Sequence, residues 1–137
     1  MTETPANPTA PRLRLRLLFG TDVMLGPGKA DLLELIRETG SISAAGRRMN
    51  MSYKRAWSLV EALNRYFAEP VVESTRGGSS GGGARLTEAG DKVLALYRRF
   101  EQHAATAGQP EIDALAAMLA VPEMAADTDT DDMAGKK

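Results

Sequence analysis

The run Ser52-Tyr53-Lys54-Arg55 gathers the side chains of this sequence best suited to binding an anion. A serine in front of an apolar-periodic stretch is a typical N-cap, so the run predicts the first turn of a helix. The free N–H groups of such a turn attract phosphate, and Lys and Arg add positive charge or paired hydrogen bonds to guanine. Tyr and Ser hydroxyls can bond phosphates or base edges. The run therefore indicates a nucleic-acid contact, with a merely solvated helix surface as the alternative.

The helix that carries this run is expected to extend from Ser52 to about Ala68. Ser58 lies on its polar side and joins the candidate base-reading residues. We assign Trp57 to the core rather than to base stacking, because it falls within an apolar stripe. That stripe consists of Ala56, Trp57, Val60, Leu63 and Phe67.

Two shorter helices are expected before it. Gly26-Pro27-Gly28 breaks the chain, residues 29–39 form the first helix, and Gly40 stands at its C-terminal cap. Ser41 or Ser43 can cap the second helix, which runs to Met49. Asn50-Met51 is the break before Ser52. In a helix-turn-helix the helix before the recognition helix crosses the DNA backbone, and here that is the helix ending at Met49. Ser43, Arg47 and Arg48 are therefore candidate contacts, with one of the two arginines expected to touch phosphate.

A hairpin with a Gly/Ser tip follows at Pro70. Strands over residues 71–76 and 84–86 flank seven residues that are all Gly or Ser. The tip lacks the Gly-Lys-Ser/Thr ending of a nucleotide-binding loop and precedes a strand, which argues against that kind of site. As a wing it would bring backbone N–H groups to the DNA backbone or minor groove, although a plain flexible loop is the alternative. The candidate contacts are Arg76, Gly78, Gly82 and Arg85.

The two ends of the folded segment are also patterned. Residues 12–17 alternate Arg and Leu, which predicts a half-buried strand with a short hairpin partner at 23–25. Its arginines are either a solvated strand face or direct phosphate contacts. Thr87 can cap a last helix from Glu88 to about Ala105, and residues 111–120 can form a short amphipathic helix.

Composition excludes several kinds of site. The 137 residues contain no Cys and one His, His103, so a thiolate nucleophile, a disulfide and a zinc site are not expected. No nucleophile–base set can be assembled, so we expect neither an enzyme nor a cofactor. No apolar run is long enough for a membrane span, and we expect a cytoplasmic protein.

Charge is unevenly distributed. Residues 1–108 hold 15 Lys and Arg against 11 Asp and Glu, a net +4, and residues 109–137 hold 2 against 7, a net −5. We therefore expect a disordered leader over residues 1–11, a domain over 12–107 and an acidic, mostly disordered tail over 108–137. The expected fold is mainly α with a small β-sheet, a winged helix-turn-helix followed by a long helix.

These residues together resemble the DNA-binding domain of ModE-type molybdate-responsive regulators, which is related to the LysR-type winged helix. The resemblance covers about residues 12–105, and its specific part is the ordered combination of motifs. They are Gly40-Ser41-Ile42-Ser43, Ser52-Tyr53-Lys54 with Ala56-Trp57, Val72-Glu73, Gly77-Gly78, Gly81-Gly82-Gly83, Leu86-Thr87 and Gly90.

The resemblance implies a homodimer that binds a palindromic operator near molybdate-uptake or molybdoenzyme genes. It also implies dimer contacts on the helix after the wing, where Val93, Tyr97 and Phe100 are the candidates, with packing inside one chain as the alternative. The Ala- and Asp-rich tail shows no strand pattern of a molybdate-binding domain, so no molybdate binding is expected in this chain. Two other functions stay open, a winged-helix protein-interaction module and a direct oxyanion sensor.

Overall fold

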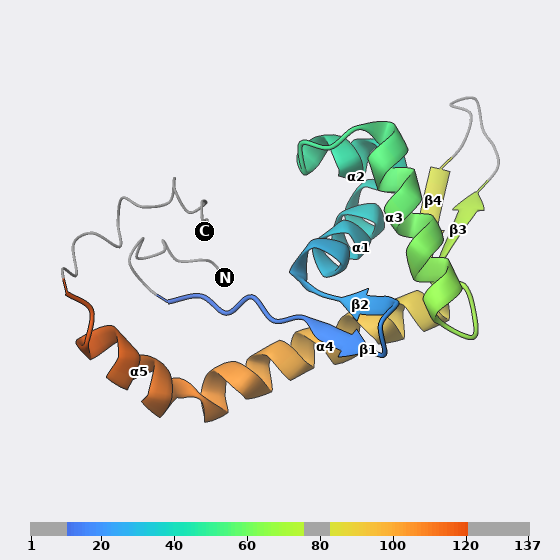
Figure 1. Cartoon of the computed structure of the whole chain (residues 1–137). Helices are drawn as coiled ribbons and strands as arrows, with labels where there is room; N and C mark the ends of the chain where they lie inside the picture. Colours follow the sequence, from blue (N-terminus) through green and yellow to red (C-terminus); the bar gives the residue numbers. More distant parts are fainter. Residues whose placement is uncertain (1–10, 76–82, 121–137) are drawn as a thin grey trace. The chain divides into compact units, whose positions relative to one another are not determined.

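The computed structural model describes residues 11–75 and 83–120, which contain five helices and four short strands (Figure 1). Contacts divide the chain into two compact units. One unit spans residues 14–102, and the described part of the other comprises residues 11–13 and 103–120. The predicted class, mainly helical with little β-structure, is confirmed. All of the predicted leader but Pro11, and most of the predicted acidic tail, lie outside the described residues.

Three helices pack together in the larger unit: α1 (Pro27–Thr39), α2 (Ile42–Arg48) and α3 (Tyr53–Tyr66). Helix α1 begins two residues earlier than predicted because Pro27 fits the first helical position, where no N–H is needed. Gly40 ends it with a φ of 72°, as predicted. Of the two candidate caps for α2, Ser41 takes the role, and its Oγ accepts a 3.0 Å hydrogen bond from the Ala44 N–H.

The N-terminal hairpin is shorter than the alternation suggested. Strand β1 (Leu17–Phe19) pairs with β2 (Val23–Leu25), starting from Leu17 opposite Leu25. The prediction of a strand over residues 12–17 is wrong in position, because the chain after Leu25 turns into α1 and leaves residues 14–16 without a partner strand. Residues 14–17 still alternate, with the arginines exposed and the leucines half-buried.

The wing consists of β3 (Val72–Thr75) and β4 (Gly83–Leu86), paired with Val72 opposite Leu86. Helix α4 (Glu88–Ala107) follows at once, and Thr87 caps it as predicted. The Thr87 Oγ1 accepts from the Gly90 N–H at 3.0 Å and donates to the Pro70 carbonyl at 2.7 Å. One threonine therefore fixes the start of α4 against the start of the wing.

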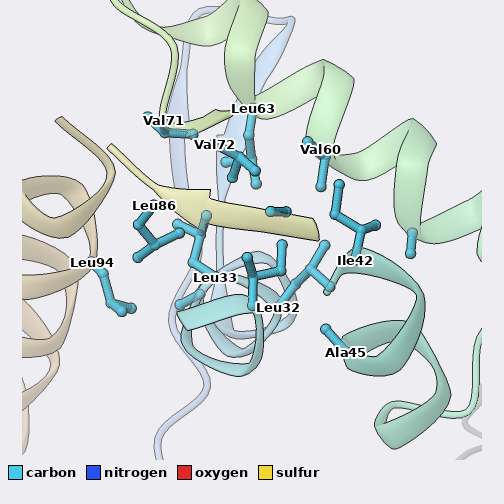
Figure 2. Close-up of a cluster of buried hydrophobic side chains, with 14 of the residues drawn as sticks. Leu32, Leu33, Ile42, Ala45, Val60, Leu63, Val71, Val72, Leu86 and Leu94 are labelled. Carbon is cyan, nitrogen blue, oxygen red and sulfur yellow. The ribbon is translucent and has the colours of Figure 1, made fainter. Parts of the chain in front are cut away.

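The core of the larger unit draws its buried side chains from every element except β1, which contributes the half-buried Leu17. Figure 2 shows Leu32 and Leu33 of α1, Val60 and Leu63 of α3 and Leu86 of β4 among the clustered apolar side chains. Burial of this kind of surface is the main stabilising contribution to the domain. The unit thereby holds α3 at a set position with respect to its neighbours.

An ion-pair cluster adds a polar contact between α4 and α1. The Arg98 guanidinium donates to Asp31 at 2.9 Å, Glu34 at 2.7 Å and Glu101 at 3.1 Å. Burial opposes the charge of Arg98, but the hydrogen bonds to these three carboxylates outweigh it and raise the pKa of Arg98 above its usual range.

The smaller unit contains the last residues of α4 and the helix α5 (Gln109–Ala117). The short C-terminal helix predicted over 111–120 is confirmed, with Pro110 in its first turn. Helix α5 buries none of its residues. Among the described helices, none combines the length and apolar character that crossing a membrane requires.

Candidate nucleic-acid interface

A tight turn sets α3 against α2. Asn50 adopts a left-handed φ of 60°, and the Met51 N–H donates to the Gly46 carbonyl at 3.0 Å. A Cβ on Gly46 would lie only 3.0 Å from the Cβ of Ala56, so the two helices approach closely because neither residue carries a larger side chain. This is the geometry of a helix-turn-helix, and it presents the N-terminus of α3 outward.

The first turn of α3 is exposed where the sequence predicted a binding surface. Ser52, Tyr53, Lys54 and Arg55 are all exposed. The Ser52 Oγ accepts a 3.0 Å hydrogen bond from the Arg55 N–H, so this hydroxyl serves as the helix cap. Within the described residues, no carboxylate lies within ion-pair distance of Lys54 or Arg55. Their charges are therefore available to a polyanion.

Trp57 supports the exposed Tyr53 from one helical turn away. The Trp57 Nε1–H donates to the Tyr53 hydroxyl, and the two rings meet edge to face with centroids 6.3 Å apart. Trp57 packs against the core but stays partly exposed, so its assignment to the core holds only for part of its ring. The contact holds the Tyr53 ring in one orientation at the exposed end of the helix.

Three further candidates lie on α2 and one on α3. The Arg47 Nη1 donates to the Ser43 Oγ at 3.0 Å, which orients this exposed arginine along α2. Arg48 instead forms an ion pair with Glu38, with its Nη1 3.7 Å from the Glu38 Oε1. Arg47 is thus the better of the two arginines for a phosphate contact. Ser58 is exposed four residues after Lys54, on the same side of α3.

In the wing, Arg85 differs from Lys54 and Arg55 because it has an acidic partner. Its Nη2 lies 2.7 Å from the Glu73 Oε2, across the pair that these two residues form in the β3–β4 ladder. This carboxylate neutralises much of the charge of Arg85. The guanidinium must therefore leave Glu73 before it can hold a phosphate. Arg76, Gly78 and Gly82 lie outside the described residues.

Asn64 positions the wing relative to α3, and the sequence reading missed it. Its Oδ1 accepts from the Val71 and Val72 N–H groups at 2.8 and 3.1 Å, and its Nδ2 donates to the Val72 carbonyl at 3.1 Å. A polar residue on the buried side of α3, close before Pro70, was the available signal. Its amide takes the place of a neighbouring strand for the first residues of the wing.

The dimerisation candidates differ in exposure. Tyr97 is 2% exposed and donates a hydrogen bond to the Leu15 carbonyl at 2.5 Å, which favours the alternative of packing inside one chain. Val93 is half-buried against the core. Phe100 and its neighbour Leu96 are exposed by 37% and 51%, so the apolar surface of α4 in this unit lies at these two residues.

Residues 29–91 match the family described as bacterial regulatory helix-turn-helix protein, lysR family. The chain is 47% identical over 85 residues to the molybdenum-pterin-binding protein MopB of Rhodobacter capsulatus, covering 62% of this chain and 32% of that protein. It is 39% identical over 95 residues to the molybdenum transport protein ModE of Azotobacter vinelandii, covering 68% and 35%. Residues 29–91 are a LysR-family helix-turn-helix domain of the ModE type.

This ModE-type domain aligns with only part of each relative. The DNA-binding transcriptional dual regulator ModE of Escherichia coli (strain K12) is 38% identical over 88 residues, which cover 64% of this chain and 34% of that protein. The chain thus spans about a third of the length of the curated relatives it matches. A solved CbnR_DBD–DNA complex shares the fold, with a TM-score of 0.51 and 24% identity over 64% of this chain and 95% of that chain.

Proposed function

We propose that this chain is a sequence-specific DNA-binding transcriptional regulator. The observation that carries the proposal is the exposed first turn of α3, where Lys54 and Arg55 have no acidic partner among the described residues. In a helix-turn-helix this turn enters the major groove, so base contacts fall to Tyr53, Lys54, Arg55 and Ser58. Ser52 caps the helix, while Ser43, Arg47 and the wing residues Arg76, Gly78, Gly82 and Arg85 hold the backbone or minor groove.

The names of the relatives, rather than the geometry, support a proposal for the regulated genes. Several related proteins carry the names molybdenum transport protein or transcriptional regulator ModE. We propose that the operator lies near genes for molybdate uptake or molybdoenzymes. Because the matched residues are a helix-turn-helix domain, we assign no molybdate site to the described residues of this chain.

A palindromic operator requires two copies of the domain, which we propose pair through α4. Phe100 and Leu96 are the large apolar residues exposed on this helix in the larger unit. Phe100→Glu is expected to convert the dimer to a monomer in sedimentation velocity. Arg99→Glu, at the neighbouring exposed position, is the matched control and should leave the dimer intact. Identical dimers from both variants would exclude this face.

The test of DNA binding is fluorescence anisotropy with duplexes from upstream of the chain's own gene and of molybdate-transport genes, against a scrambled duplex across a salt series. We expect tighter binding to one segment that persists at physiological salt. Lys54→Ala or Arg55→Ala should weaken operator binding by about 1–3 kcal/mol, and Lys92→Ala on α4 should not. Equal losses on operator and scrambled DNA would reassign the residue to phosphate contact. No binding by the unaltered protein at low salt would favour the interaction module instead.

A further inference from the structure

A positively charged groove lies beside the first turn of α3. Its volume is about 470 Å³, and three segments of the larger unit line it. These are the residues before β1, the stretch from β2 into the start of α1, and α3 with the turn that precedes it. Four of the lining residues are cationic and none is acidic: Arg14, Arg16, Met24, Gly26, Pro27, Gly28, Lys29, Met51, Arg55 and Leu59.

The arginines of this groove are uncompensated. In the described part of the chain, the guanidinium groups of Arg14, Arg16 and Arg55 have no carboxylate within ion-pair distance. Several arginines elsewhere in the same unit do have one, as in the pair of Arg37 with Asp91 at 3.7 Å. Cations that converge on one groove without acids repel each other and focus positive potential there, and a bound anion relieves that repulsion.

The start of α1 adds uncharged hydrogen-bond donors to the same groove. Gly26 caps this helix without a side-chain hydrogen bond, so the N–H groups of the first turn keep their capacity to bind an anion. A Cβ on Gly28 would meet nothing within 4 Å, which leaves the backbone open to a ligand. A Cβ on Gly26 would lie 3.1 Å from the Arg16 Cγ, so the bare glycine lets the arginine stem lie against the helix start.

We propose that this groove binds a phosphate of the DNA backbone that flanks the bases read by α3. The inference rests on the proposed function. Phosphate is a compact oxyanion that matches converging guanidinium groups and helix N–H groups. The DNA backbone is the favoured source because Arg55 belongs both to the groove and to the exposed first turn of α3. A free inorganic oxyanion has the same chemistry and is the other source.

The first arm of the test compares the salt dependence of DNA binding between two double variants of equal charge. Arg14→Gln with Arg16→Gln removes the groove cations, while Lys92→Gln with Arg99→Gln removes two exposed cations of α4. The groove variant should flatten the slope of log affinity against log salt by about 1, the loss of one phosphate contact, on operator and scrambled DNA alike. Arg14→Lys with Arg16→Lys should restore most of the slope. A groove variant with the same slope as the α4 variant overturns the DNA contact.

The second arm measures thermal stability in inorganic phosphate against chloride at equal ionic strength. Phosphate that stabilises the unaltered protein and not the groove variant, together with equal DNA slopes, would assign the groove to a free oxyanion and overturn the DNA source. If the unaltered protein binds no DNA, the proposed function fails. The phosphate measurement then tests by itself whether the groove binds an oxyanion. Stabilisation that depends on Arg14 and Arg16 then supports an oxyanion groove, and its absence overturns it.

Discussion

The side-chain amide of Asn64 on α3 forms two reciprocal hydrogen bonds with the main chain of Val72 at the start of β3, both at 3.1 Å. The same Oδ1 also accepts from the Val71 N–H at 2.8 Å. One side chain thus satisfies three main-chain groups beside the fully buried Val71. This contact joins α3 directly to the start of the wing.

Asn64→Ala is expected to lower the free energy of unfolding by about 2 kcal/mol, because it leaves part-buried N–H and C=O groups without partners. Urea unfolding followed by circular dichroism measures the change. Arg65→Ala, at the next and exposed position, should change it by less than about 0.5 kcal/mol. Equal stability of the two variants would show that water replaces the amide at the wing.

Gly90→Ala is expected to destabilise the domain by more than about 2 kcal/mol, since overpacking against the main chain cannot be relieved by a rotamer change. The new Cβ would lie 2.1 Å from the Val71 carbonyl oxygen. Gly28→Ala is the matched control, because its Cβ meets nothing within 4 Å and replaces a glycine inside α1. That control should be neutral or stabilise by up to about 1 kcal/mol. Thermal and urea unfolding measure the stability of both variants. A similar loss of stability in the two would contradict the packing argument.

Glu73→Gln is expected to strengthen DNA binding without sequence preference, because it releases Arg85 from a 2.7 Å ion pair and removes a negative charge from the wing. The salt slope of binding should steepen by about 1. The stability should fall by less than about 1 kcal/mol, since both side chains are exposed. Glu73→Gln in an Arg85→Gln background should lose the gain in slope. An unchanged slope in the single variant would mean that Arg85 does not reach DNA.

Tyr97 should make the stability of the domain fall at alkaline pH. Burial, with a further contribution from the nearby Glu101 carboxylate, raises the pKa of Tyr97 above its usual value of 10.0. Below about pH 10 both the folded and unfolded chains hold the proton, so the contribution is fully present. As pH rises through the folded pKa, the unfolded state has already released its proton and that contribution is lost.

Tyr97→Phe should remove this part of the alkaline loss, and the lost hydrogen bond to Leu15 should cost about 1 kcal/mol at neutral pH. Urea unfolding between pH 8 and pH 11, on the variant and the unaltered protein, separates the two effects. Tyr66→Phe is the control because this tyrosine is only partly buried. Parallel pH profiles for the Tyr97 variant and the unaltered protein would contradict the assignment.

Much of the local structure could be predicted because its signals are local. Gly40 ends α1 in a left-handed conformation, and Ser52 and Thr87 cap α3 and α4 through their own hydroxyls. The exposed basic turn of α3 follows from the same information, since the apolar stripe fixes which side of the helix faces outward. The strand over residues 12–17 was misplaced because a strand needs a partner, and its partner ends at Leu25.

By itself, the sequence determined the order of helix, turn, helix and wing, and the exposed Tyr53, Lys54 and Arg55 at the start of α3. Only the tertiary structure decided which polar groups meet across the chain. It paired Arg85 with Glu73, joined Asn64 to Val72, buried Tyr97 against Leu15 and gathered Arg14, Arg16 and Arg55 around one groove. Caps and helical periodicity act over a few neighbouring residues, whereas these contacts depend on how separate elements pack, and no local pattern encodes that.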